Sequence, residues 1–265
     1  VSVWMRWIGS MKNPLNKRFI RELREDWTKY LVIFLLMTGM IGLVSGFIVA
    51  DESILKAYNE SFEKYNIEDG HFNVDKKLNN QSLINISKHG VTLYDHSYVE
   101  ETLINKNKVR IFATPQEVNK VCVIEGNLPR NDNEIAIDRM YATNNKLGVG
   151  DYIKSHDHRL RISGLVALSD YSALFENNSD TMFDAIKFGV GVVTPSLFNQ
   201  WDTTHKTYSY SWLYNNTPSN EEKRSESFLK QLNKEVHLEE YIPRYQNQAI
   251  NFTGDDMGGD GVMVT

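Results

Sequence analysis

The stretch YLVIFLLMTGMIGLVSGFIVA, from Tyr30 to Ala50, contains no charged residue. At about 1.5 Å of helical rise per residue, its 21 residues span roughly 30 Å, the thickness of a bilayer's hydrocarbon core. A signal peptide has a shorter apolar region and a small residue two positions before its cleavage site, where this chain has Ile48. Soluble domains rarely bury so long an apolar run. The sequence therefore predicts a retained transmembrane helix over residues 30–50.

The charges that flank this run predict its orientation. Residues 1–29 hold seven Lys and Arg against three acidic residues, whereas Asp51, Glu52, Glu60 and Glu63 dominate the other side. Because Lys and Arg are retained on the cytoplasmic side, we expect a cytoplasmic N-terminus and an extracytoplasmic main domain in the cell membrane.

The overall charge narrows the choice of partners. The chain has a net charge of -5 and its first 29 residues contribute +4, so the remainder carries about -9. A domain this acidic, without a basic stripe, is not expected to bind nucleic acid. The single cysteine, Cys122, excludes an intrachain disulfide, and its apolar neighbours favour a small hydrophobic residue in a strand.

An amphipathic helix is predicted before the membrane span, over residues 14–29. Its apolar residues recur at helical spacing between basic ones, which is typical of a helix lying on the inner leaflet in contact with lipid; they are Leu15, Phe19, Ile20, Leu23 and Trp27. The alternative is a basic flank that only fixes topology. Residues 1–13 form an N-terminal extension to which we assign no function.

Within the span, small residues recur every four positions: Thr38, Gly42, Gly46 and Ala50. Small side chains at this spacing let a second helix approach closely in lipid. This row is a candidate helix-packing face for further spans of the same protein or for a second copy of it.

The rest of the chain predicts an α+β fold. A helical period continues from Asp51 to Tyr65, so that one unbroken helix is expected from residue 30 to residue 65. Alternating patterns then predict a mixed domain rich in antiparallel strands, at 91–99, 108–114, 120–126, 134–138, 160–168 and 210–214. Helices are expected at 194–201, with Pro195 in the first turn, and at 220–236, with a capping box from Ser219 and Glu222. We place this domain at 51–250 and a Gly/Asp-rich linker at 251–265; the resemblance described below implies that the linker leads toward a second transmembrane helix.

Motifs that carry chemistry are missing from the sequence. It contains no phosphate-binding Gly-x-x-x-x-Gly-Lys-Ser/Thr, no His-Glu-x-x-His, no Gly-x-Ser-x-Gly and no Cys-x-x-Cys. His156, Asp157 and His158 have the residue types of a metal site, but their place between Asp151 and a strand at Leu160 favours a hairpin loop. We therefore predict a non-enzymatic protein with no catalytic, cofactor or metal site.

A specific pattern lies between Ile124 and Phe175. It runs Glu125-Gly126-x-Leu-Pro129, then Asn133-Glu134-Ile-Ala-Ile-Asp138, then Val-Gly150-Asp151-x-Ile, then Ile162-Ser-Gly-Leu-Val166. This order resembles the extracytoplasmic core domain of ABC transporter permeases of the FtsX-like, MacB-type superfamily, and Arg21 to Ala50 resembles that family's interfacial and first transmembrane helices. The motif positions Glu125, Gly126, Pro129, Gly150 and Asp151 fit turns, since Gly tolerates positive φ and Asp bonds to turn amides.

The resemblance implies a permease subunit with this domain inserted between its first and second spans. A separate cytoplasmic ATP-binding subunit would supply ATP hydrolysis, and motion of the outer domain would couple it to export or mechanical signalling. The alternative is a single-pass anchored sensor or ligand-binding module. The substrate and the oligomeric state stay open.

Overall fold

The computed structural model describes residues 24–155, 158–201 and 206–261. The chain divides into two units with a boundary between residues 56 and 57, and helix α3 (Trp27–Tyr65) belongs to both. The predicted unbroken helix over residues 30–65 is therefore confirmed. The large apolar side chains from Leu31 to Val49 are 38–71% exposed. Of the described helices, α3 is the one long and apolar enough to cross a membrane.

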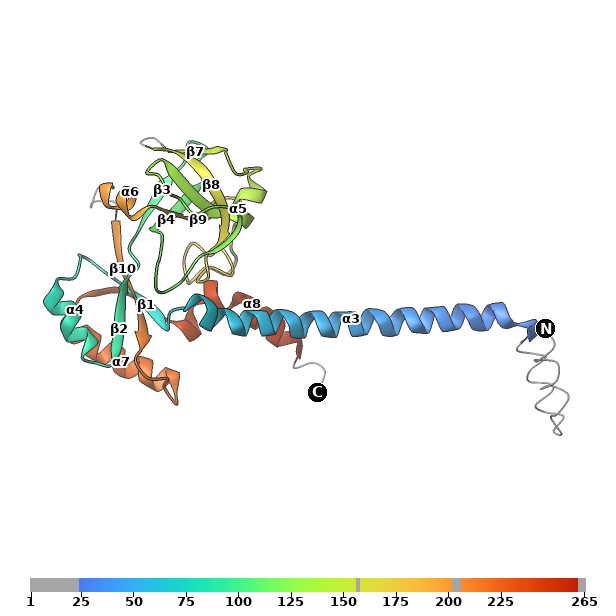
Figure 1. Cartoon of the computed structure of the whole chain (residues 1–265). Coiled ribbons are helices and arrows are strands. Elements are labelled where there is room, and N and C mark those ends of the chain that lie inside the picture. The colour runs from blue at the N-terminus through green and yellow to red at the C-terminus, as the bar shows by residue number, and fades with distance from the viewer. Residues whose placement is uncertain (1–23, 156–157, 202–205, 262–265) are drawn as a thin grey trace. The chain divides into compact units, whose positions relative to one another are not determined.

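The second unit is a mixed α+β domain, as predicted (Figure 1). Its described strands form one sheet in the order β11-β1-β10-β3-β4-β9-β6-β8-β5, with β2 added on β10 and β7 on β8. The pairs β4–β9 and β6–β8 are parallel and the others antiparallel. The strands are β1 (Gly70–Val74), β2 (Val91–Asp95), β3 (Tyr98–Thr102), β4 (Lys108–Ala113), β5 (Cys122–Gly126), β6 (Glu134–Asp138), β7 (Tyr152–Lys154), β8 (Arg159–Ala167), β9 (Phe188–Val193), β10 (Lys206–Tyr214) and β11 (Leu238–Pro243).

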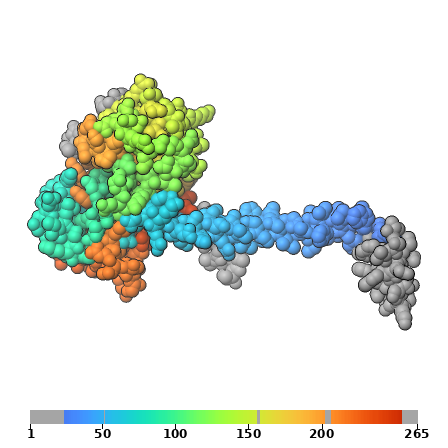
Figure 2. Space-filling model, viewed as in Figure 1, coloured from blue at the N-terminus to red at the C-terminus, as the bar shows by residue number. Residues whose placement is uncertain are grey.

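Two of the three hydrophobic clusters in this unit are the cores of two lobes, and the third consists of Ala173, Phe175 and Ala249. In the first lobe α4 (Asn80–Ser87) and α7 (Glu221–Glu235) lie side by side, as Figures 1 and 2 show, and pack against Phe72 and Trp212 of the sheet. In the second lobe, β4, β6, β8 and β9 form the core with α5 (Arg139–Asn144) and α6 (Pro195–Gln200). Strand β10 joins the lobes, because its first residues pair with β3 and its later ones with β1 and β2.

The strand predicted at 91–99 is two strands with a corner between them. Asp95 Oδ1 accepts a hydrogen bond from the Ser97 amide (3.0 Å), the turn that Asp favours, and the His96 amide donates to Ser209 O (2.9 Å). The corner lets β2 and β3 pair with different parts of β10. No Gly or Pro marks the corner in the sequence, which is why the pattern predicted a single strand.

The start of one predicted helix differs in detail from the prediction, and the start of another agrees with it. Helix α7 is capped by Asn220, whose Oδ1 accepts from the Lys223 amide (2.8 Å), rather than by Ser219 and Glu222. Helix α6 begins as predicted, with Thr194 as the cap and Pro195 in the first turn.

The described part of the segment expected to be a linker, residues 251–261, belongs to a helix, α8 (Gln248–Gly261), which follows the short 3-10 helix η2 (Arg244–Gln246). Its start packs against the end of α3: the Tyr58 hydroxyl lies 3.4 Å from Ile250 O and 3.3 Å from Asn251 Oδ1. Gly254 lies against the Tyr58 ring, since a β-carbon at Gly254 would come within 2.8 Å of it. The glycine that suggested a linker thus permits close helix packing.

Candidate functional site

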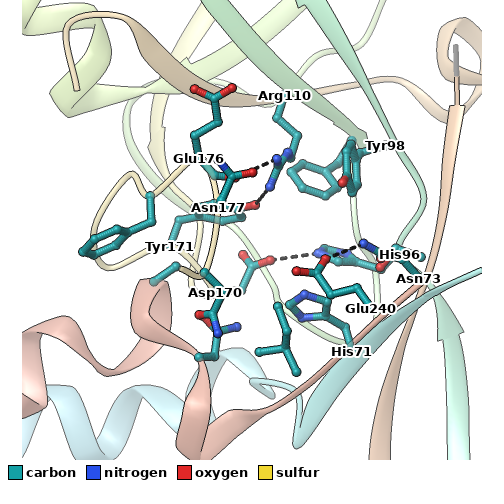
Figure 3. Close-up of a pocket in the computed structure, with 17 residues that line it drawn as sticks. His71, Asn73, His96, Tyr98, Arg110, Asp170, Tyr171, Glu176, Asn177 and Glu240 are labelled. Carbon is teal, nitrogen blue, oxygen red and sulfur yellow. Dashed lines mark hydrogen bonds and ion pairs between the residues drawn. The ribbon is translucent and has the colours of Figure 1, made fainter. Parts of the chain in front are cut away.

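A polar cavity of about 80 Å³ lies where the two lobes meet the loop that follows β8 (Figure 3). Its walls come from β1, β4, β11, the corner between β2 and β3, the loop 169–178 and the start of α8. The residues that the argument uses are His71, Asn73, His96, Arg110, Asp170 and Glu240. Titratable groups gathered from so many segments make this cavity the candidate functional site.

His96 and Asp170 form the ion pair at the centre of the site. His96 Nε2 lies 2.9 Å from Asp170 Oδ2, and the imidazole stacks on Phe112 with the ring centres 4.6 Å apart. Burial alone would lower the pKa of His96, but the hydrogen bond and charge of Asp170 raise it above its ordinary value. The pair therefore holds a proton between the β2–β3 corner and the loop.

A second pair lies behind His71. Glu68 is fully buried, and its Oε1 lies 2.6 Å from His71 Nδ1 while Oε2 accepts from Asn119 Nδ2 (2.8 Å) and the Ser211 hydroxyl. Burial raises the pKa of Glu68, yet His71, His96 and the Ser211 hydrogen bond together lower it to about 2. Glu68 is thus a fixed negative charge that links the end of α3 to β1 and β10.

Arg110 organises the opposite wall. It donates to Glu100 Oε1 on the neighbouring strand (2.6 and 3.0 Å), to the Tyr171 hydroxyl (2.8 Å) and to the carbonyl of Glu176 (2.9 Å). Its guanidinium also lies 4.4 Å from the centre of the Tyr98 ring. Arg110 therefore fixes the loop 169–178 to β4 at two points.

The same loop holds the start of α8. Ser172 donates to the Ala249 carbonyl from its amide and hydroxyl, both at 2.7 Å. Asn178 donates from Nδ2 to Gln246 O (2.9 Å) and accepts at Oδ1 from the Gln248 amide (2.8 Å). A change at the cavity is thus connected to α8 through one short loop.

Two acceptors in the wall of the cavity lack a donor. Asn73 Nδ2 donates to Glu240 Oε2 (2.7 Å), but Asn73 Oδ1 and Asp170 Oδ1 are buried and accept no hydrogen bond from any described residue. The described residues hold no group of three His, Cys, Asp or Glu arranged for a metal ion. The cavity is chemically suited to a small hydrogen-bond donor.

The sequence did not single out any of these residues. They come from positions 68–249 and share no local motif, so that only β pairing brings them together. The register places Asn73 opposite both Ser209 and Glu240, and Arg110 opposite Glu100. No pattern in the chain gives this register in advance.

The predicted family-motif positions lie elsewhere, around a depression of about 220 Å³ lined by Gly126, Val149 and Glu134. Gly126 has φ +72° and Gly150 φ +100°, and Asp151 Oδ2 accepts from the Gly148 amide (2.8 Å). Glu125 is exposed in β5, and Pro129 is half-buried in the irregular segment that follows. The structure thus places Gly150 and Asp151 in a turn, and Glu125 and Gly126 at the end of a strand.

The residues predicted to lie at or in the membrane are only partly described by the structure. Leu15, Phe19, Ile20 and Leu23 lie outside the described residues, while Trp27 begins α3 and is 58% exposed. Thr38, Gly42, Gly46 and Ala50 are exposed along α3, and a β-carbon at Gly42 or Gly46 would meet nothing within 4 Å. The packing face therefore stays a prediction.

The predicted hairpin near His158 is only partly described, since His156 and Asp157 lie outside the described residues. His158 Nδ1 lies 3.2 Å from Glu101 Oε1, and the ring lies 4.6 Å from that of Trp201. His158 has the surroundings of a packed side chain at the start of β8.

No protein-family model and no curated protein matches this chain. Among solved structures, it is similar to the periplasmic region of MacB from Actinobacillus actinomycetemcomitans, with 12% identity and a TM-score of 0.35 over 63% of this chain and 85% of that one. A likeness this distant carries no argument about activity or partners. The structure itself defines an α+β domain that follows a helix able to cross a membrane.

Proposed function

We propose that the chain is the membrane-spanning permease subunit of an ABC transporter, with its α+β domain outside the cytoplasm. A separate cytoplasmic subunit would hydrolyse ATP, and the domain would convert that hydrolysis into export or into a mechanical signal across the membrane. The proposal joins the sequence resemblance, the charge-based orientation and the apolar helix α3.

The observation that carries the proposal is the contact between the helix by which the chain enters the domain and the helix by which it leaves. Along the last turns of α3, Tyr58 contacts Asn251 and Gly254, and Phe62 lies under the guanidinium of Arg244 (5.4 Å). Tyr58 precedes Phe62 in the chain, whereas the residues that Tyr58 contacts follow Arg244, the residue that Phe62 contacts. The two segments therefore run antiparallel. A domain inserted between two transmembrane helices needs this arrangement.

The entry and exit are also fixed to each other by charge. Arg244 Nη1 lies 2.9 Å from Asp69 Oδ1, and the Arg244 amide donates to Asp69 O (2.8 Å). Asp69 follows the end of α3, and Arg244 precedes α8. Motion of α3 would therefore reach α8 and, through the loop 169–178, the polar cavity.

Assembly with an ATPase tests this function. The full-length gene product would be co-expressed with a candidate ATP-binding subunit, extracted in mild detergent and separated by size. We expect a stable complex whose ATPase activity changes when the interfacial residues Phe19 and Leu23 are replaced by Asp. A monodisperse permease chain that binds no ATP-binding subunit would contradict the proposal.

The proposed orientation has its own test in a Cys122→Ala background. A cysteine at the exposed Asp75 should react with a membrane-impermeant maleimide on intact cells, whereas one at Ser10 should react only after lysis. The reverse pattern would overturn the assignment of the domain to the outside.

The second candidate is a single-pass anchored sensor or binding module. The specific observation in its favour is the cavity, because two of its buried acceptors, on Asn73 and Asp170, are unpartnered among the described residues. A protein that binds a ligand at the cavity and assembles with no ATPase would support this candidate.

A further inference from the structure

We infer that the polar cavity between the lobes binds a primary ammonium group. The inference depends on neither proposed function, because it concerns only what the walls of the cavity recognise.

Unpartnered acceptors on two walls are the first observation. Asn73 on β1 and Asp170 on the loop after β8 are 6% and 4% exposed, and each keeps one oxygen without a donor among the described residues. Figure 3 shows both side chains at the cavity, together with Glu240. A buried acceptor without a donor destabilises the folded protein, so a ligand that donates a hydrogen bond here removes that penalty on binding.

The number of acceptors matches one kind of donor. An ammonium group has three N–H donors and no acceptor. Asp170 Oδ1 and Asn73 Oδ1 supply two acceptors, and the Glu240 carboxylate supplies a third, since it uses one oxygen for Asn73 and has lone pairs to spare.

The charge of the walls favours a cation over a neutral donor. Arg110, the permanent cation of the lining, is paired with Glu100, and Glu176 is paired with Lys108. His96 and His71 each lie against a carboxylate. Glu240 has no ion-pair partner among the described residues, so its charge is free to attract a cation at the mouth of the cavity.

The volume limits the ligand. Pockets that enclose a drug-sized ligand measure roughly 300–1,000 Å³, so a cavity of about 80 Å³ admits only a small head group. That fits the head of an alkylammonium group, with the remainder of the molecule outside. A quaternary ammonium, which has no N–H and is bulkier, does not fit either requirement.

Thermal unfolding of the full chain in detergent, followed by tryptophan fluorescence, tests the inference because a ligand of the native state raises the midpoint. Methylammonium chloride should raise it saturably, whereas potassium chloride and tetramethylammonium chloride at equal ionic strength should not. An equal response to all three salts would overturn the inference.

Variants locate the site. Asn73→Ala and Asp170→Asn should each weaken the apparent affinity for methylammonium at least tenfold. For each variant, the shift is measured from that variant's unfolding midpoint without ligand. The matched surface controls Asn216→Ala and Asp75→Asn, both exposed, should bind as the unmodified protein does. If the two cavity variants do not fold, Glu240→Gln keeps an acceptor for Asn73 and removes only the charge, and we expect a severalfold loss. Unchanged binding in the folded variants would overturn the assignment.

Two sources of a primary ammonium group are then separated by probe. Nα-acetyl-lysine methylamide represents a lysine side chain, and glycerophosphoethanolamine represents a lipid headgroup. One probe should bind to the unmodified protein more tightly than methylammonium does, but should not bind more tightly to Asn73→Ala. That probe identifies the source of the ammonium group. If neither probe binds, access is limited to small free amines, and failure of methylammonium itself would refute the site.

Discussion

The imidazole of His96 and the carboxylate of Asp170, 2.9 Å apart, join the β2–β3 corner to the loop that holds α8. The corner belongs to the strands that link the two lobes, and the loop belongs to the exit from the domain. One buried ion pair therefore connects the cavity, the sheet and the helix that follows.

The first prediction concerns the pH dependence of this pair. Because the pKa of His96 is raised above its unfolded value near 6.5, protonation stabilises the folded state. This stabilisation is fully present below about pH 6.5 and is lost as pH rises through the raised pKa. His96→Gln should lower the free energy of unfolding by about 2 kcal/mol at pH 6 and by less at pH 9.

Denaturant unfolding between pH 5 and 9 measures this difference. His237→Gln is the matched control, because His237 is exposed, and it should change stability little at any pH. A His96→Gln deficit that grows with pH would contradict the role of the pair.

The second prediction concerns Glu68, whose contribution to stability changes with pH in the opposite direction to that of His96. Its pKa is lowered to about 2, so the stabilisation from its charge is present above its unfolded value and is lost as pH falls toward 2. Glu68→Gln should cost about 3 kcal/mol at pH 7, since it leaves the donors around the carboxylate without their charged partner. Between pH 4.5 and 2 the stability of the variant should fall less steeply than that of the unmodified chain. Glu239→Gln, at an exposed position, serves as the control, and parallel pH profiles for all three proteins would contradict the prediction.

The third prediction concerns the turn after β5. Gly126 has φ +72°, and a β-carbon there would lie 2.4 Å from Ser163 O, so Gly126→Ala combines backbone strain with a clash. We expect a loss of about 3 kcal/mol in unfolding free energy. The control is Gly148→Ala in the nearby turn, where a β-carbon comes no closer than 3.8 Å to Asp151 Oδ2, and it should cost less than about 1 kcal/mol. Equal losses in the two variants would show that the turn does not need this glycine.

The sequence predicted the features that local periodicity encodes. The apolar run gave α3, alternation gave the strands β4 to β6, β8 and β10, and Pro195 marked the start of α6. The positive φ of Gly126 lies within the motif that suggested a turn.

The features that the sequence pattern missed depend on tertiary contacts. The composition of 251–265 suggested a linker. The first turn of α8 instead packs against the side chain of Tyr58, which lies nearly two hundred positions earlier in the chain. His96 and Asp170 belong to segments that only the sheet brings together. No property of either residue's neighbours indicates its partner, so the cavity could not be found without the register of β1, β10 and β11.

The fourth prediction tests the packing of α8 on α3. Gly254→Val would place a β-carbon 2.8 Å from the Tyr58 ring, so α8 should be displaced and the domain destabilised by about 1–3 kcal/mol. Tyr58→Ala removes the ring that causes the clash. The double variant should therefore be more stable than the sum of the two single losses predicts, and additive losses would show that the helices do not pack at this point.

The fifth prediction concerns the small-residue row in the membrane span. Because side chains added at Gly42 or Gly46 meet nothing within 4 Å, Gly42→Leu and Gly46→Leu should leave the unfolding midpoint of the outer domain unchanged. The same side chains would hold apart a partner helix that packs against the row, so the double variant should associate at least tenfold more weakly with a second span or a second copy. Energy transfer between labelled full-length chains in nanodiscs measures this association. Gly39→Leu is the matched control, since Gly39 is equally uncrowded but lies off the row, and a loss as large in this variant would show that the row is not the packing face.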